Sequence, residues 1–211
     1  MMQPGPDDLV VDIGCGDASL LRMLNHSTKR VGIVGTIEEQ RRLESTYPDL
    51  SIKAGEMQCL PLESGVASKI VCNGVLLYLQ SESEVRAALC EIKRIARSDA
   101  LILLGEIPEI DEYEYYGVYR GNSMLAFLWH LARRNGLRAF LGMIRRWAKA
   151  IFGREQIVLN SAGIFFAGPE RMVKMAESCG LVLKTYFKHQ DIERHGKSVE
   201  SRFRYDYLFT V

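Results

Sequence analysis

Two glycines follow directly after a short apolar run near the start of the chain, in a position that suits ligand binding. The run Leu9–Ile13 predicts a buried strand, Gly14 and Gly16 break it on either side of Cys15, and helical spacing begins at Ala18. Glycines at such a turn let the backbone approach a ligand at the start of the following helix. A plain tight turn between strand and helix would use the same residues and remains the alternative.

The elements that must position this loop alternate between strands and helices. Further strands are predicted at 30–34, 50–54, 69–73 and 100–104, with helices over 37–45 and 82–97 between them. This alternation predicts right-handed crossovers and a doubly wound, mostly parallel, Rossmann-like α/β sheet. A helix over 170–178 and two final strands, 181–186 and 202–211, predict an antiparallel hairpin at the edge of a seven-stranded sheet.

The composition indicates a globular protein of a reducing compartment. The 211 residues carry a net charge of +1, which argues against nucleic-acid binding through bulk charge. No apolar run reaches the roughly 20 residues that cross a bilayer, and no basic segment precedes an apolar block as in a signal peptide. The five cysteines include no Cys-x-x-Cys pair, so we expect a cytoplasmic protein.

One segment departs from the α/β alternation. Between 113 and 154 the chain has eight Lys and Arg residues and the single acid Glu114, and apolar residues recur at helical spacing over 136–154. We therefore expect a single domain over 1–211 with a helical, basic insertion at about 111–160. A basic amphipathic helix suits contact with an anionic membrane, which would place the protein at the inner membrane surface. The alternative is a helical lid whose arginines are solvated.

Several motifs in register resemble the class I S-adenosylmethionine-dependent methyltransferases, of the type 11/12-like group. Val10–Gly16 is similar to the first motif of that family, Ala54–Leu62 to the stretch after its third strand, and Ile70–Leu76 to its fourth-strand motif. Glu91–Ile95 also matches, and the resemblance covers roughly residues 9 to 107. A dinucleotide-binding loop fits less well, because Ser19 stands where its third glycine belongs.

The resemblance implies S-adenosylmethionine as the cofactor and a set of residues that would bind it. Asp12 and the glycine loop would line its methionine portion, Glu56 would accept from the adenine amino group, and Asn73 would lie near the sulfonium. The complete set that we expect to bind the cofactor is Asp12, Gly14, Cys15, Gly16, Thr36, Glu56, Met57 and Asn73.

The chain departs from that family at the end of the second strand. The acid that holds the ribose hydroxyls is replaced around Gly35 and Thr36, and Glu38 lies one turn later. The first motif also begins as early as residue 9, which leaves little chain for the helices that often cover the cofactor. These departures favour, as the alternative function, a non-catalytic methyltransferase fold that acts as a binding or scaffold module.

The acceptor side offers several candidates for a general base. Methylation of a hydroxyl usually needs such a base, and the candidates are Tyr78, Glu106, His130, His189 and His195. A lone histidine is more often a surface or packing residue. The closing stretch, 201–209, resembles the last strand of methyltransferases that act on sugars of bacterial surface polysaccharides, which implies a small-molecule or surface-glycan acceptor. No Cys/His cluster has metal-ligand spacing, so we expect no metal.

Overall fold

The computed structural model describes residues 2–24, 29–79, 81–109, 165, 167–192 and 196–211. The chain divides into two units, Met1–Ile110 with Ile164–Val211, and Asp111–Gly163. The predicted basic insertion, with His130 and the helix over 136–154, lies outside the described residues, as does His195. The single domain that we expect from the sequence therefore stays a prediction, and the fold below is that of the first unit.

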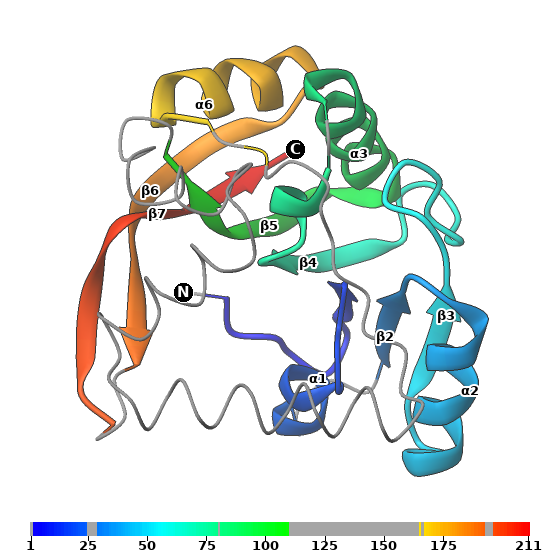
Figure 1. Ribbon diagram of the computed structural model, residues 1–211. Coiled ribbons are helices and arrows are strands. Elements are labelled where there is room, and N and C mark those ends of the chain that lie inside the picture. Colours follow the sequence, from blue (N-terminus) through cyan, green and yellow to red (C-terminus); the bar gives the residue numbers. More distant parts are fainter. Residues whose placement is uncertain (1, 25–28, 80, 110–164, 166, 193–195) are drawn as a thin grey trace, which may run out of the picture. The chain divides into compact units, whose positions relative to one another are not determined.

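A seven-stranded sheet in the order β3-β2-β1-β4-β5-β7-β6 forms this unit (Figure 1). The strands are β1 (Leu9–Ile13), β2 (Lys29–Val34), β3 (Ser51–Ala54), β4 (Ala67–Asn73), β5 (Ala96–Pro108), β6 (Val182–Ile192) and β7 (Ser198–Thr210). The first five run parallel, β7 pairs antiparallel with β5, and β6 pairs antiparallel with β7 at the edge. This order confirms the predicted doubly wound sheet and its antiparallel edge hairpin.

Helices cover both faces of the sheet, but unevenly. The helices are α1 (Ser19–Met23), α2 (Ile37–Thr46), α3 (Glu82–Ile95) and α6 (Pro169–Ser178), with a 3-10 turn η1 at Leu76–Tyr78. The larger core joins α3 and α6 to one face, and a smaller core joins α1 and α2 to β1, β2 and β3 on the other. On this second face, the side chains of Val71 in β4 and Leu103 in β5 are only half-buried.

Local signals set the boundaries of the helices. Ser81 caps α3 by accepting a hydrogen bond from the Glu84 amide at 3.2 Å, and the apolar stripe of the helix is fully buried. The helix ends at Ile95, two residues before the predicted end, because Ala96 adopts extended backbone and pairs with Ala67 of β4. Pro169 occupies the first turn of α6, as its position in the sequence predicts.

A bulge interrupts β5 where it passes the carboxyl end of β4. The pairing of β5 with β7 shifts register between Leu104 and Ile107, so Gly105 and Glu106 lie in the irregular part. Glu106 has a positive φ of 60°, a strained backbone conformation for a residue other than glycine. The bulge therefore sets the direction of the Glu106 side chain at the edge of the sheet where α/β proteins bind their ligands.

Candidate functional site

The glycine loop after β1 is a tight turn whose backbone conformation favours glycine. Gly14 and Gly16 have positive φ angles of 75° and 56°, and a Cβ at Gly14 would overlap the side chain of Val75. The amides of Gly14 and Cys15 both donate to the Ile33 carbonyl, at 2.9 and 3.0 Å, so these two amides are already satisfied within the protein. The loop is thus held against β2, and its contribution to a ligand site is close backbone approach.

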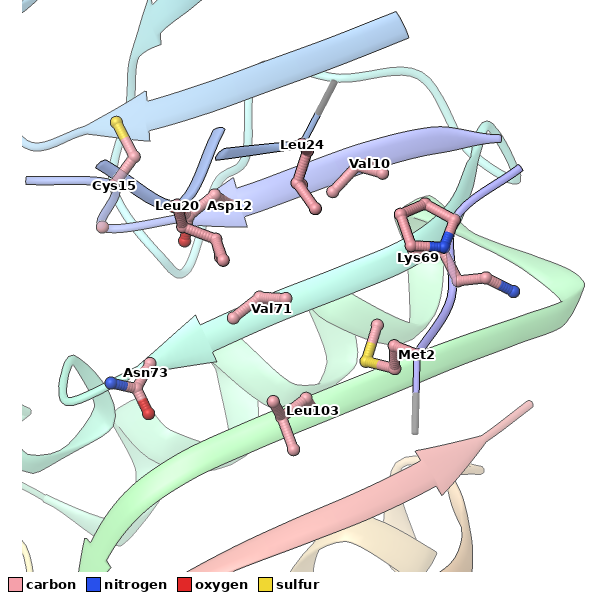
Figure 2. Close-up of a pocket in the computed structure, with 12 residues that line it drawn as sticks. Met2, Val10, Asp12, Cys15, Leu20, Leu24, Lys69, Val71, Asn73 and Leu103 are labelled. Atoms are coloured by element: carbon pink, nitrogen blue, oxygen red, sulfur yellow. The ribbon is translucent and has the colours of Figure 1, made fainter. Parts of the chain in front are cut away.

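A cavity of about 480 Å³ opens beside this loop and extends along the half-covered face of the sheet. Asp12, Gly14, Cys15 and Asn73 line it, which brings together four of the residues that the resemblance assigns to the cofactor. Figure 2 shows Val71 and Leu103 on the neighbouring strands β4 and β5 at the apolar part of the cavity. The site therefore combines a polar end at the carboxyl ends of the strands with an apolar floor.

Asp12 is the buried charge of this cavity. The residue is 5% exposed, and its carboxylate makes no hydrogen bond or ion pair with any of the residues that the structure describes. Burial raises the pKa of the Asp12 carboxyl from 3.8 to about 6. Because a buried carboxylate without a partner is costly, its position at the cavity wall suits a ligand that brings a positive charge.

Cys15 has a packing role at the same loop. Its side chain is buried, and its Sγ lies 2.6 Å from where a Cβ on Gly32 of β2 would stand, so Gly32 makes room for it. The pKa of the Cys15 thiol is raised to about 11, and burial is the largest cause of this rise. The thiol therefore stays protonated at neutral pH and is unsuited to nucleophilic chemistry.

The tip of β2 carries a carboxylate from α2 in place of the missing strand-end acid. Thr36 caps α2 by accepting from the Glu39 amide at 3.2 Å, and its hydroxyl donates to the Glu39 carboxylate at 3.2 Å. The same carboxylate lies 3.9 Å from where a Cβ on Gly35 would stand, and its charge helps to raise the pKa of the Cys15 thiol. Glu39, rather than Glu38, therefore returns to the strand tip beside the glycine loop. The Thr-x-x-Glu spacing of a capping box was the signal for it.

The two residues expected at the adenine ring follow β3. Glu56 is exposed, and its backbone forms an isolated bridge with Cys59. Met57 is half-buried and packs against the larger core. Neither residue lines the cavity. Their roles toward the cofactor, like those of the other residues implied by the resemblance, stay predictions.

A polar cluster lies at the carboxyl ends of β4 and β5, next to the cavity. The Asn73 amide donates to Glu106 Oε1 at 2.8 Å, and Arg204 donates to Glu106 Oε2 at 2.5 Å. Asp206 Oδ1 accepts from the Glu106 amide at 2.8 Å, and both Asp206 oxygens lie 3.0 Å from His189 Nδ1. The structure thus brings together two of the five candidate bases, Glu106 and His189.

One candidate base lies away from the cavity, and three charged residues of the cluster were not expected from the sequence. Tyr78 is 56% exposed on η1 and does not line the cavity. Arg204, Asp206 and Asp191, which pairs with Arg204, were not expected from the sequence. Their signal was the presence of charged residues within strands that otherwise alternate aromatic side chains. Among the described residues no group of three or more His, Cys, Asp or Glu side chains is arranged so that it could hold a metal ion, and no helix in that part of the chain could span a membrane.

Comparison with known proteins agrees with the motifs. Residues 11–104 match the family model of the methyltransferase domain. A protein in transposon TN4556 of Streptomyces fradiae is 28% identical over 108 residues, which are 48% of this chain. The match covers 30% of that protein, so the chain corresponds to less than a third of this curated relative.

Solved structures share the fold at low sequence identity. A methyltransferase of Methanosarcina mazei superposes with a TM-score of 0.62 at 14% identity over 99% of this chain and 94% of its own. A putative Haloferax volcanii methyltransferase, solved with the Trm112 activator, gives 0.65 at 15% identity over 99% and 84%. A geranyl diphosphate methyltransferase in complex with S-adenosylmethionine gives 0.58 at 13% identity over 99% and 79%. At these identities the likeness shows the fold alone.

Proposed function

We propose that the chain, whose residues 11–104 match the methyltransferase domain model, is a member of the class I S-adenosylmethionine-dependent methyltransferases and moves a methyl group from S-adenosylmethionine to an oxygen or nitrogen of an acceptor. The acceptor class is a small molecule or a surface glycan. The observation that carries this proposal is the Asp12 carboxylate, buried at the cavity wall beside the glycine loop and without a partner among the described residues.

The residues of the cavity fit such a cofactor. S-adenosylmethionine supplies a methyl group that its sulfonium makes electrophilic. A carboxylate at Asp12 attracts the α-ammonium group of the molecule's methionine end, and the backbone at Gly14 and Gly16 lets the ligand approach β1 closely. Asn73 stands at the same cavity, where its side chain helps to fix the position of the reacting end.

Glu39 is our candidate for the ribose hydroxyls. Its carboxylate lies at the tip of β2, hydrogen-bonded to Thr36 and close to Gly35. A carboxylate accepts hydrogen bonds from two neighbouring hydroxyls, which is what the missing strand-end acid would have done. The capping contact holds Glu39 in this place before any ligand binds, so the loss of the strand-end acid does not by itself favour the non-catalytic alternative.

A binding experiment tests the proposal. Calorimetric titration of the full chain with S-adenosylmethionine and S-adenosylhomocysteine should give micromolar affinity for both. Gly14→Ala should abolish binding, because its Cβ would overlap Val75 at a positive φ. Gly168→Ala is the matched control, since a Cβ there meets nothing closer than Glu109 at 3.8 Å. Equal binding by both variants would show that the glycine loop is not the cofactor site.

The location of the protein forms part of the same proposal. We infer a cytoplasmic enzyme, and contact with an anionic membrane surface through 136–154 remains a proposal on residues that the structure does not describe. Co-sedimentation with vesicles tests that contact. Binding to the vesicles should require anionic lipid and weaken with added salt. Binding that does not depend on salt concentration would contradict the proposed contact.

A further inference from the structure

We propose that Glu106 and His189, the latter oriented by Asp206, bind the amino group of the methyl acceptor, and that His189 removes its proton. This proposal rests on the proposed function, because it names the acceptor class of the same site. It goes further by choosing nitrogen over oxygen and by assigning a catalytic base. Each step follows from the geometry of the cluster at the ends of β4 and β5.

The cluster adjoins the proposed cofactor cavity through Asn73. Asn73 lines the cavity and donates to Glu106 Oε1 at 2.8 Å. Gly105 leaves room for this contact. A Cβ at this position would overlap Asn73 Oδ1 and would lie 3.3 Å from Asp206 Oδ1. Asn73 and Gly105 are also paired in the sheet, so the Asn73 side chain projects from the face on which a Cβ at Gly105 would stand. A group held at Glu106 therefore lies next to the end of the cavity where Asn73 stands.

The imidazole of His189 is oriented as a general base requires. Its Nδ1 lies 3.0 Å from both carboxylate oxygens of Asp206, which are acceptors only, so we assign the ring hydrogen of the neutral tautomer to Nδ1. The lone pair is then on Nε2, which makes no hydrogen bond with the described residues. Asp206 itself is fixed, since its Oδ1 also accepts from the Glu106 amide at 2.8 Å.

The gap between the two acceptors matches an amino group. His189 Nε2 and Glu106 Oε1 lie 3.9 Å apart, too far for a direct hydrogen bond. At an atom about 2.8 Å from each of them, the two acceptors would subtend an angle of about 90°, which is about 20° below the H–N–H angle of a tetrahedral nitrogen and within the range over which hydrogen bonds bend. A protonated primary amine donates to both acceptors at once, whereas a hydroxyl has a single hydrogen to give.

The charges around the gap also favour a cation. The cluster contains three carboxylates and one guanidinium: Glu106 and Asp191 pair with Arg204, and Asp206 faces His189. Arg204 pairs with both Glu106 and Asp191, which leaves Glu106 Oε1 to Asn73 and to the gap. With His189 neutral, the cluster is negative in total and attracts an ammonium group.

The proton transfer is balanced within these groups. The bound ammonium gives one proton to Nε2: the N–H bond breaks, its electron pair stays on nitrogen, and a new N–H bond forms on the imidazole. The positive charge moves onto the imidazolium, which lies between the Asp206 and Glu106 carboxylates. The neutral amine that remains has the free lone pair that methylation at nitrogen requires.

Binding of a matched pair of probes tests the amine site. The probes are 2-phenylethylamine and 2-phenylethanol, which differ only in the group that would occupy the gap. Proton NMR of the full chain should show that the amine shifts the His189 ring signal, which His189→Gln identifies among the four histidines. Saturation-transfer NMR should show the amine binding at least tenfold more weakly to Glu106→Gln and His189→Gln. No binding of the amine, or equal binding of the alcohol, would overturn the proposal.

A control variant separates the site from general charge. Glu200→Gln removes an exposed carboxylate of the same hairpin, on β7 opposite Gln190, and should leave amine binding unchanged. Equal loss in Glu200→Gln and Glu106→Gln would show attraction to an acidic surface only, and would contradict a built site.

Kinetics test the base. With S-adenosylmethionine present, His189→Gln should lower kcat for methylation of 2-phenylethylamine about 100-fold or more, in addition to the tenfold rise in KM that its weaker amine binding gives. Asp206→Asn should lower kcat at least tenfold, because the ring hydrogen of His189 is then no longer held on Nδ1. An unchanged kcat in His189→Gln, or a bound amine that is never methylated by the wild-type protein, would overturn the assignment. Calorimetry on the same variants should show unaltered cofactor affinity, and a wild-type protein that binds the amine but no cofactor would refute the proposed function instead.

Discussion

Replacing Asp12 by Asn should make the protein more stable and inactive at the same time. The substitution keeps the shape of the side chain and removes a charge that is 5% exposed and has no partner among the described residues. Stability and cofactor binding should then respond in opposite directions. This divergence separates a carboxylate kept for a ligand from one kept for the fold.

The magnitude follows from the pKa. Burial raises the pKa of the Asp12 carboxyl from 3.8 to about 6, a rise of about 2 units that corresponds to about 3 kcal/mol. Since the folded-state pKa lies above the unfolded one, the neutral form stabilises the protein below about pH 4, and this contribution is lost as the pH rises through about 6. At pH 7 the charged carboxylate therefore costs about 3 kcal/mol, which Asn avoids.

Thermal unfolding across pH 4 to 8 measures this effect. The Tm of Asp12→Asn should equal that of the wild-type protein near pH 4 and exceed it by about 6–12 °C at pH 7 to 8. Asp17→Asn is the control in the same loop, because that exposed carboxylate accepts from the Ser19 amide at 3.1 Å and its pKa is lowered. The loss of the Asp17 carboxylate should slightly destabilise the protein at neutral pH.

Cofactor binding gives the second half of the same test. Asp12→Asn should lose measurable affinity for S-adenosylmethionine, and the wild-type affinity should fall as the pH drops below about 6, because the carboxyl must be charged to bind a cation. A variant that is less stable at every pH by the same amount would refute the reasoning. It would mean that Asp12 holds a structural hydrogen bond instead of an unpaired charge.

Three further results are expected. Gly105→Ala should lower the Tm by about 2–8 °C in differential scanning fluorimetry, because the new Cβ displaces Asn73; an unchanged Tm would contradict the close contact. Glu39→Gln should weaken S-adenosylmethionine binding about tenfold in calorimetry at a nearly constant Tm, and an unaltered affinity would remove it from the ribose site. Diamide should oxidise Cys90 and Cys179, whose sulfurs lie 2.8 Å apart, with the loss of two of five free thiols; a full thiol titre after treatment would contradict this pairing.

The fold and the first half of the candidate site, the glycine loop, could be predicted from the sequence because their signals are local. An apolar run, a break at Gly14 and Gly16 and a following helix predict the loop, and the structure puts it there with the positive φ angles that need glycine. The continuous apolar segment 100–104 predicts a strand, and β5 lies inside the sheet, between β4 and β7.

The second half of the site depends on long-range register, which no local pattern contains. His189 meets Asp206 because β6 and β7 pair antiparallel, with a register shift between Lys188 and Gln190. Glu106 joins them only because the bulge in β5 gives it a positive φ. At the tip of β2, Glu39 rather than Glu38 is our candidate for the ribose hydroxyls, since the capping contact to Thr36 turns its side chain back toward the strand.

Calorimetric titration of the folded, full-length chain with S-adenosylmethionine at pH 7.5 tests the central claim most directly. We expect a micromolar dissociation constant, competition by S-adenosylhomocysteine, and loss of binding in Asp12→Asn despite its higher Tm. No heat and no rise in Tm at millimolar cofactor, with the protein shown to be folded, would contradict it.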